Sequence, residues 1–173
     1  MFELQTERLT LRQFTTTDDR ALHQAIFSDP DVMRFGDGVQ SLEWTRAWIQ
    51  RCQQDYYETR GYGPFVVVER SERLLIGYCG LFYFSDVNGQ SEVELGYRLA
   101  RHAWGRGYAT EAAIAVRDYA VTTLGMKRLI AMIDPANLAS IGVAEKLGMR
   151  FESEVLFEGY SHPDHVYAIH CAE

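Results

Sequence analysis

Cysteine is scarce in this sequence, and its three cysteines form no familiar pattern. Cys52, Cys79 and Cys171 are far apart, odd in number and include no Cys-x-x-Cys pair. This spacing argues against a disulfide or zinc framework and favours reduced thiols in the cytoplasm. Met1–Glu3 begins no signal peptide, and no apolar run is long enough to span a bilayer. We therefore expect a cytoplasmic protein without a membrane segment.

An excess of positive charge is also lacking. The chain has 17 Lys and Arg against 24 Asp and Glu, which gives a formal net charge of −7. Nonspecific nucleic-acid binding needs a basic face, so we expect no nucleic-acid partner. The negative charge fits a cationic or amine-bearing partner better. There is also no internal repeat and no low-complexity tract.

What the chain does have is the composition of a folded domain. Its 173 residues are 47% hydrophobic and 13% aromatic, which is enough to bury a substantial core. Strand patterns are predicted at residues 9–14, 65–69, 74–84, 92–99, 128–133, 149–157 and 165–171. Helical patterns are predicted at residues 19–26, 41–52, 109–124 and 137–147, with the first ended by Ser28–Asp31. The sum is one α/β (α+β) domain, residues 1–173, with a mixed, mostly antiparallel sheet flanked by helices.

Two glycines precede the predicted helix at 109–124. Gly105 and Gly107 lie in the stretch Trp104–Ala113, where small residues let the backbone approach a ligand closely. A helix that begins there adds unpaired N–H groups and the positive end of its dipole, which together suit phosphate oxygens. Thr110 stands at the third glycine position of a dinucleotide fingerprint, and no Gly-Lys-Ser/Thr of a P-loop follows. By themselves the two glycines favour a plain turn.

Sequence blocks on both sides of this loop change that interpretation. Their order and spacing resemble the GNAT acyltransferases, and the blocks are Glu94–Tyr97, Trp104–Ala112, Asn137–Ser140 and Glu145–Met149. The opening Thr6–Arg12 is similar to the first strand of the branch that includes the ribosomal-protein N-terminal acetyltransferases. The resemblance covers nearly the whole chain. It implies one GNAT domain, a sheet splayed between residues 92–99 and 128–133, and acetyl-CoA as co-substrate.

The resemblance also implies where coenzyme A binds. The pyrophosphate would lie on backbone N–H groups of the glycine loop, and the pantetheine arm would pair with the strand before it. The residues implied are Leu95, Tyr97, Arg98, Leu99, Trp104, Gly105, Arg106, Gly107, Tyr108, Ala109, Thr110, Asn137 and Ser140. Trp104 departs from the Gln or Arg of many family members, but a site built from backbone tolerates that change. Arg101 and Arg106 are candidates for extra positive charge, and a solvated loop is an equal alternative.

Glu94 is the candidate base for the incoming ammonium. In the predicted strand 92–99 the apolar residues alternate onto one face, so Glu92, Glu94 and Gly96 share the other. A carboxylate there accepts a proton directly or through water. The structural alternative is an ordinary polar-face residue, which is our interpretation of Glu92. The resemblance favours Glu94 as the base and suggests that the N–H near Leu95 polarises the thioester carbonyl.

The proton donor for the leaving thiolate departs from the family pattern. Many members have a tyrosine acid where this chain has Ala144, so we assign the role to Ser140 or a water. Asn137 and Ser140 each have a structural alternative, because Asn is a good N-cap and Ser is common in a first turn. We expect no metal, because no zinc spacing is present among the C-terminal candidates, which are His162, Asp164, His165 and His170.

These features together predict an acetyl-CoA-dependent N-acyltransferase. The acceptor would be a protein N-terminal amine or a small-molecule amine, attacking directly in a ternary complex without a covalent enzyme intermediate. Two alternatives stay open. A noncatalytic CoA-binding or sensor domain is favoured by the missing tyrosine at Ala144, and a purely structural partner-binding domain would have no CoA affinity. The sequence does not indicate an oligomeric state.

Overall fold

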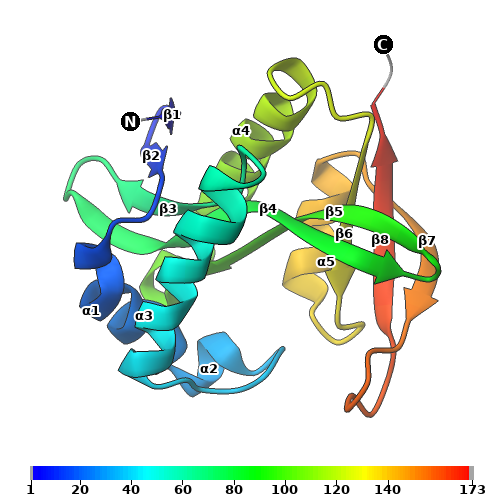
Figure 1. The fold of residues 1–173 in the computed structure, drawn as a ribbon, viewed down its shortest axis with the longest axis horizontal. Helices are drawn as coiled ribbons and strands as arrows, with labels where there is room; N and C mark the ends of the chain where they lie inside the picture. Colours follow the sequence, from blue (N-terminus) through cyan, green and yellow to red (C-terminus); the bar gives the residue numbers. More distant parts are fainter. Residues whose placement is uncertain (1, 172–173) are drawn as a thin grey trace.

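The computed structural model describes residues 2–171, and within them one eight-stranded sheet carries helices on both faces (Figure 1). The strand order is β1-β2-β3-β4-β5-β6-β8-β7. The strands are β1 (Glu3–Gln5), β2 (Leu9–Arg12), β3 (Pro64–Glu69), β4 (Leu74–Val87), β5 (Gln90–Leu99), β6 (Arg128–Ile133), β7 (Arg150–Val155) and β8 (Asp164–His170). All neighbouring pairs are antiparallel except β5 and β6. The predicted mixed, mostly antiparallel sheet is therefore confirmed.

Two helical layers cover the sheet because its central strands are apolar on both faces. Phe65 and Val67 of β3 lie in a core with α4 (Tyr108–Thr122) and α5 (Leu138–Lys146), whereas Val66 lies in a core on the opposite face. That opposite face is covered by three helices, α1 (Asp19–Leu22), α2 (Pro30–Met33) and α3 (Leu42–Arg51). Wider π-type turns extend α1 through His23–Phe27 and α3 through Cys52–Glu58. Strands buried on both faces are continuously apolar, as the sequence of β3 is.

Two helices begin close to where they were predicted. The Ser41 side chain accepts a hydrogen bond from the Trp44 N–H at 3.0 Å, and α3 begins directly behind it. Asn137 caps α5 in the same way, by accepting from the Ser140 N–H at 3.2 Å. The first helical segment begins earlier than predicted, because the Asp18 carboxylate accepts from the Thr15 N–H and so stands inside the first turn.

Two short elements were not predicted. The edge strand β1 is only three residues long, so it has too little alternation to be recognised. The helix α2 begins at Pro30, in a stretch that was predicted only to end the preceding helix. Asp29 accepts from the Asp31 N–H at 2.9 Å, and proline is favoured at the first helical position. The same residues therefore end one helix and start the next.

Within residues 2–171, the sheet opens at its one parallel pairing, between β5 and β6. β5 and β6 are in register only at Glu94 and Ile130, although β5 continues alongside β4 as far as Leu99. In Figure 1 the two strands diverge toward the lower part of the view. This confirms the splay expected between residues 92–99 and 128–133. No helix within residues 2–171 combines the length and the apolar character needed to cross a membrane.

Candidate functional site

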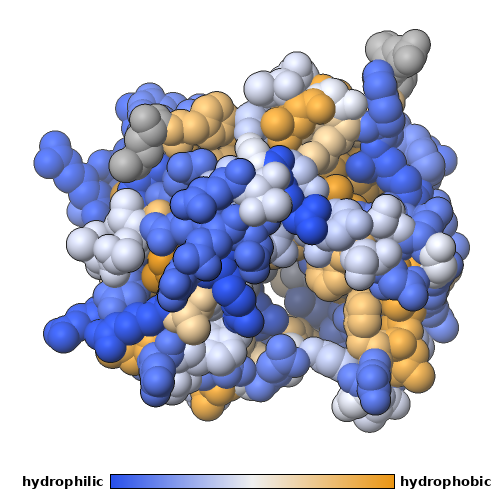
Figure 2. Space-filling view, in the orientation of Figure 1, coloured by the Kyte–Doolittle hydropathy of each residue, from blue (hydrophilic) through white to orange (hydrophobic). Residues whose placement is uncertain are grey.

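A large cleft begins where β5 and β6 separate. Its volume is about 1310 Å³, which exceeds the roughly 300–1,000 Å³ typical of a pocket for one small ligand. In Figure 2 the surface is hollowed near the centre of the view, between the part that carries α1–α3 and the part that carries β6–β8. The cleft therefore has room for two substrates side by side.

Nearly all of the predicted site residues line this one cleft. They are Glu94, Leu95, Tyr97, Arg98, Leu99, Trp104, Gly105, Gly107, Tyr108, Ala109, Thr110, Asn137 and Ser140. Arg106 does not line it, although its two glycine neighbours do. Ala144, the position at which the family resemblance led us to expect a tyrosine, also lines the cleft and is buried.

Glu94 lies at the fork of the sheet. Its carboxylate accepts a hydrogen bond from the backbone N–H of Met132 in β6, at 3.0 Å. The side chain thus occupies the place that a β5 carbonyl would take in a continuous ladder. A Cβ added at Gly96 would lie 3.3 Å from the Phe82 ring and 3.4 Å from the Glu94 carboxylate, so glycine leaves that carboxylate room.

The surroundings of Glu94 change its acidity. Burial in the cleft raises the pKa of Glu94 to about 7, and the negative charge of Asp164 acts in the same direction. The Met132 N–H and the Arg98 guanidinium lower the pKa of Glu94 by smaller amounts. A carboxyl that titrates near neutral pH is suited to take up a proton in one step and release it in another.

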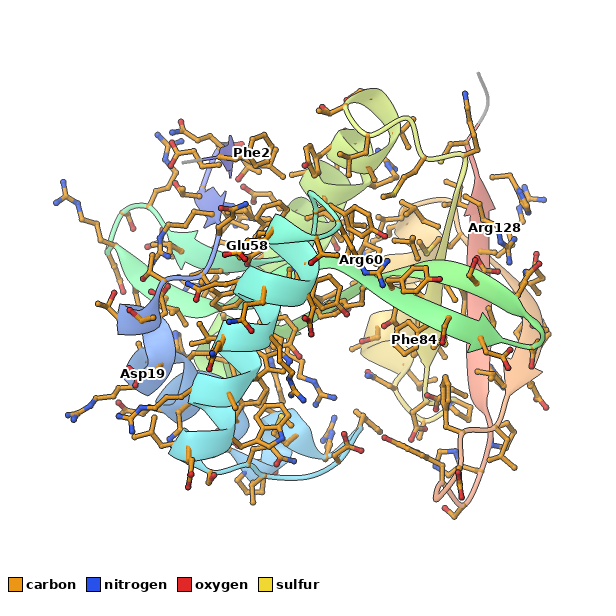
Figure 3. All side chains as sticks on the ribbon, in the orientation of Figure 1. Phe2, Asp19, Glu58, Arg60, Phe84 and Arg128 are labelled. Carbon is orange, nitrogen blue, oxygen red and sulfur yellow. The ribbon has the colours of Figure 1, made fainter. Side chains whose placement is uncertain are left out.

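Glu92, two residues earlier on the same face, has a different environment. Its carboxylate is buried against the Arg128 guanidinium at 2.8 Å, and Arg128 also contacts Glu152. Arg128 belongs to β6, among the strands at the right of Figure 3. Glu92 is therefore part of a buried ion-pair network, whereas the sequence suggested only an ordinary residue of the polar face.

The glycine loop turns the chain into α4. Gly105 and Gly107 have φ angles of 70° and 81°, the left-handed region that side chains with a Cβ rarely adopt. Gly107 is the N-cap of α4 and supplies no side-chain hydrogen bond, so the first N–H groups of the helix lack a capping acceptor. Glycine at these positions is thus required by the backbone, and the turn leaves donors at the cleft.

The side chains around this loop hold it in place. The Trp104 indole N–H donates to the Leu99 carbonyl at 2.7 Å, which ties the loop to the end of β5. Arg101 forms ion pairs with Asp29 and Asp31, each at 2.8 Å, so its charge is already balanced by two carboxylates. Of the two arginines considered for the phosphates, Arg101 instead fastens the start of α2.

Tyr97, which the sequence implicated only through its backbone, also contributes its side chain to the cleft. The Tyr97 hydroxyl donates to the Ser140 Oγ at 3.1 Å, across the gap between β5 and α5. Burial raises the pKa of Tyr97 to about 12, so its phenol stays protonated at neutral pH. Alternation along β5 puts Tyr97 on the face toward α5, and this was the available signal for its hydroxyl.

The Arg98 side chain supports a second wall of the cleft. Its guanidinium donates to the carbonyls of Phe35 at 3.0 Å and Val32 at 3.3 Å, and so holds the segment that follows α2. A Cβ at Gly36 would come within 2.4 Å of this guanidinium, so the close approach needs glycine. The sequence did not indicate this contact, because the segment is more than 60 residues away in the chain.

Carboxylates gather beyond Glu94 at the mouth of the cleft. Asp134, His162 and Asp164 bring one ligand atom each within 4.8 Å of one another, and the His162 ring lies 3.3 Å from Asp134. This is the group among residues 2–171 that could hold a cation, and it differs from the zinc spacing sought in the sequence. Phe84, labelled in Figure 3, lines the cleft from β4.

Comparison with known proteins gives the family. The family described as "Acetyltransferase (GNAT) domain" matches residues 8–150. Among relatives, the uncharacterized protein YkkB of Bacillus subtilis (strain 168) is 36% identical over 155 residues, covering 88% of each chain. The uncharacterized N-acetyltransferase p20 of Bacillus licheniformis is 33% identical over 162 residues, covering 92% of this chain and 88% of its own. The crystal structure of a GNAT-family acetyltransferase from Bacillus anthracis superimposes with a TM-score of 0.80 at 30% identity, covering 98% of both chains.

More distant structures share the fold while their names point to different acceptors. A putative ribosomal-protein-serine acetyltransferase from Vibrio cholerae has a TM-score of 0.80 at 24% identity, covering 98% of this chain and 97% of its own. A spermidine N-acetyltransferase from Vibrio cholerae, in complex with CoA and spermine, has a TM-score of 0.76 at 19% identity, covering 95% and 96%. The ribosomal-protein branch is thus one among several neighbours of this fold. The family match and the close relatives establish that this chain belongs to the GNAT acetyltransferases, acyltransferases that use acetyl-CoA.

Proposed function

We propose that the protein transfers an acetyl group from acetyl-CoA to an amine by direct attack in a ternary complex, with Glu94 as the base. The observation that carries this proposal is the position of Glu94. Its carboxylate stands at the fork of the sheet, in the same cleft as the glycine loop, and its pKa of about 7 allows proton uptake at neutral pH.

For the coenzyme we propose a site made mostly of backbone. The pyrophosphate would accept hydrogen bonds from N–H groups between Gly105 and Thr110, where the N-terminus of α4 favours negative charge. The pantetheine arm would pair with β5 from Leu95 to Leu99, since β6 has left that edge. Trp104 already donates to the Leu99 carbonyl, so we assign the pairing chiefly to the groups before Leu99.

The chemistry then needs one base and one donor. Glu94 takes a proton from the ammonium, and the neutral amine attacks the thioester carbonyl, whose oxygen is polarised by the N–H near Leu95. The C–S bond breaks with both electrons going to sulfur, and the second proton of the amine nitrogen passes to that sulfur through a hydroxyl or a water, while Glu94 releases the first proton to solvent. The departing thiolate is basic, as a cysteine thiol with its pKa of about 8.5 illustrates, so it gains from a nearby hydroxyl donor.

Ser140 is the donor we propose for that thiolate. The Tyr97 hydroxyl donates to the Ser140 Oγ, so the hydroxyl hydrogen of Ser140 stays available for an acceptor in the cleft. The Tyr97–Ser140 pair would take the place of the tyrosine acid that is absent at Ala144. In this chain a tyrosine reaches the site from β5 rather than from α5.

The acceptor we propose is a protein N-terminal amine or a small-molecule amine that brings positive charge. Asp134 and Asp164 stand near Glu94 at the mouth of the cleft, where they would attract an ammonium group. A protein N-terminus follows from the ribosomal-protein branch that the sequence resembles, and the spermidine enzyme is an example of the small-molecule class. The cytoplasm is the compartment we propose, because Cys52, Cys79 and Cys171 are free thiols.

A second candidate is a noncatalytic CoA sensor, and the observation in its favour is Ala144. Calorimetric titration with acetyl-CoA, followed by thiol release over a panel of amines and peptides, separates the candidates. We expect a dissociation constant in the micromolar range, about −8 kcal/mol, and turnover with at least one amine. Binding without turnover on any amine would favour the sensor. Absence of binding would mean that the glycine loop is only a turn.

A further inference from the structure

The turn between β1 and β2 packs against the first turn of α4. Glu111, in that helical turn, accepts a hydrogen bond from the Thr6 hydroxyl at 2.6 Å and from the Arg8 backbone N–H at 2.9 Å. The Arg8 side chain meets the same carboxylate through its Nε at 2.7 Å and its Nη2 at 2.6 Å. A segment more than 100 residues earlier in the chain is therefore fastened to the start of the helix behind the glycine loop.

The remaining arm of the Arg8 guanidinium reaches the loop itself. Its Nη1 donates to the Arg106 carbonyl at 2.9 Å. In a trans peptide the C=O and the following N–H point in opposite directions, and the described residues contain no cis peptide. A carbonyl of Arg106 held toward Arg8 therefore turns the Gly107 N–H away from Arg8. Gly107 lines the cleft and Arg106 does not, in agreement with this orientation.

Arg8 also fills the space directly under the loop. Its guanidinium carbon lies 4.4 Å from the centroid of the Tyr108 ring, and a Cβ added at Gly107 would be 3.4 Å from Nη2. The Arg8 side chain is 41% exposed and the Glu111 side chain is 18% exposed, so this pair lies near the surface behind the loop rather than in the core.

Charge gives Arg8 a second effect. Glu111 brings a negative charge to the N-terminus of α4, where it would repel a phosphate group. The hydrogen bonds from Thr6 and Arg8 keep the pKa of Glu111 below its usual range, so this carboxylate is charged at neutral pH. The Arg8 guanidinium cancels that charge at contact distance. Removal of Arg8 would leave an unbalanced carboxylate beside the loop.

We propose that Arg8 is a positioning residue of the coenzyme site, which holds the Arg106–Gly107 peptide so that the Gly107 N–H faces the pyrophosphate. The inference rests on the proposed function, because it assumes that the pyrophosphate lies on the glycine loop. Arg8 acts through the loop backbone and through Glu111, and it makes no contact with the reacting atoms.

The test compares two thioesters that differ in the phosphates. For Arg8→Gln we expect the CoA dissociation constant, measured by calorimetry, and kcat/KM for acetyl-CoA to worsen about tenfold, equivalent to about 1.4 kcal/mol. S-acetylpantetheine lacks the pyrophosphate, so its kcat/KM should change less than about twofold, a difference below about 0.5 kcal/mol. A purely structural role would move both thioesters together.

Two further variants complete the design. Arg46→Gln breaks the pair between Arg46 of α3 and Asp19 of α1, which has the same 2.7 Å contact. Asp19, labelled in Figure 3, does not line the cleft, so this variant should leave CoA affinity unchanged. Arg8→Lys keeps the charge but lacks the planar guanidinium that contacts Glu111 and the Arg106 carbonyl at the same time. This variant provides the test if Arg8→Gln does not fold. We expect its CoA affinity to lie between those of the wild type and Arg8→Gln.

The possible outcomes separate the two proposals. If the wild-type protein binds no CoA, the proposed function itself is wrong. A wild-type protein that binds CoA, with unchanged affinity in Arg8→Gln and Arg8→Lys, overturns the inference about Arg8 alone. Equal losses with acetyl-CoA and S-acetylpantetheine also overturn it, because Arg8 would then only stabilise the fold.

Discussion

The two walls of the cleft are built in different ways. The glycine-loop wall, residues 104–110, presents backbone N–H groups at the start of α4, and its shape depends on two left-handed glycines. A second wall consists of residues 31–37 and 157–164, and it depends on side chains from distant parts of the chain. It meets the first wall at the Arg101–Asp31 ion pair. Arg98 holds one of these segments, and the Tyr160 hydroxyl donates to Asp37 at 2.6 Å to join the two.

This difference decides how each wall can be recognised. A backbone site needs particular residues only where the chain turns, so it leaves a short, local glycine pattern. A side-chain wall needs partners that meet only after folding, and its residues show no fixed spacing. The variants below test that division by changing backbone on one side and side chains on the other.

The largest effect should come from Gly107→Val. A branched residue at φ 81° strains the backbone by about 1–3 kcal/mol, and it redirects the N–H groups proposed to hold the pyrophosphate. We expect CoA affinity, measured by calorimetry, to fall by more than about a hundredfold, or about 2.7 kcal/mol. Gly125→Val is the matched control, since Gly125 has φ 67° just beyond the other end of α4. It should lower the melting temperature and leave CoA affinity intact, and equal affinities in the two variants would contradict the phosphate site.

Glu94→Gln should lower kcat by about a hundredfold without changing CoA affinity, because it removes only the base. The base works when deprotonated, so wild-type kcat/KM should fall as pH drops below about 7. This decrease in kcat/KM on the acidic side of the pH profile, the acidic limb, should be absent in Glu94→Gln. Glu92→Gln, which breaks the pair with Arg128, should reduce stability and keep the limb. A limb that persists in Glu94→Gln would assign the base to another group.

The raised pKa of Glu94 also predicts an effect on stability. The folded state holds this proton up to about pH 7, whereas the unfolded state releases it near 4.5. The folded protein therefore binds more protons between these values, and its free energy of unfolding falls as the pH rises through that window. Thermal melts should show Glu94→Gln gaining stability over the wild type at pH 8 but not at pH 4. An equal difference at both values would mean that burial does not shift this group.

Tyr97→Phe should lower kcat by about tenfold, the loss of one hydrogen bond of about 1–1.5 kcal/mol. The ring stays in place, so CoA affinity should not change. The loss should shrink for an acetyl thioester whose thiol is more acidic, because its thiolate needs less help to leave. Tyr119→Phe, which lies in the core on α4, is the control.

Ser140→Ala should resemble Tyr97→Phe, and the double variant should be little worse than either, because the two hydroxyls act as one unit. Additive losses would show that the two hydroxyls act independently. They would contradict the proposal that Tyr97 orients the Ser140 hydroxyl.

The smallest effect should come from Tyr160→Phe. The bond from Tyr160 to Asp37 is partly exposed, so its loss should cost about 0.5–1 kcal/mol. It joins the two segments of the side-chain wall, and we expect the KM of the acceptor to change by about threefold. CoA affinity should stay constant, since the glycine loop is not involved. A change in CoA affinity alone would show that the two walls are not independent.

Prediction from the sequence succeeded where a pattern is local. The alternation along β5 placed Glu94 and Gly96 on one face, and the Asn137 cap and the glycine turn stand where they were expected. It failed where a contact joins distant segments. The Tyr97 hydroxyl on Ser140 and the Arg8 contact with Arg106 join residues 43 and 98 positions apart, so neither has a signature in spacing.

By itself, the sequence determined the order of most strands and helices, the glycine turn before α4 and the acidic residue in mid-strand. These follow from periodicity and from the steric demands of the backbone, which act within a few residues. Only the tertiary structure decided that β5 and β6 part at Glu94 and that burial there raises its pKa. The reason is physical: desolvation and hydrogen-bond geometry depend on which distant segments meet, and that is fixed only when the sheet and its two helical layers close around the cleft.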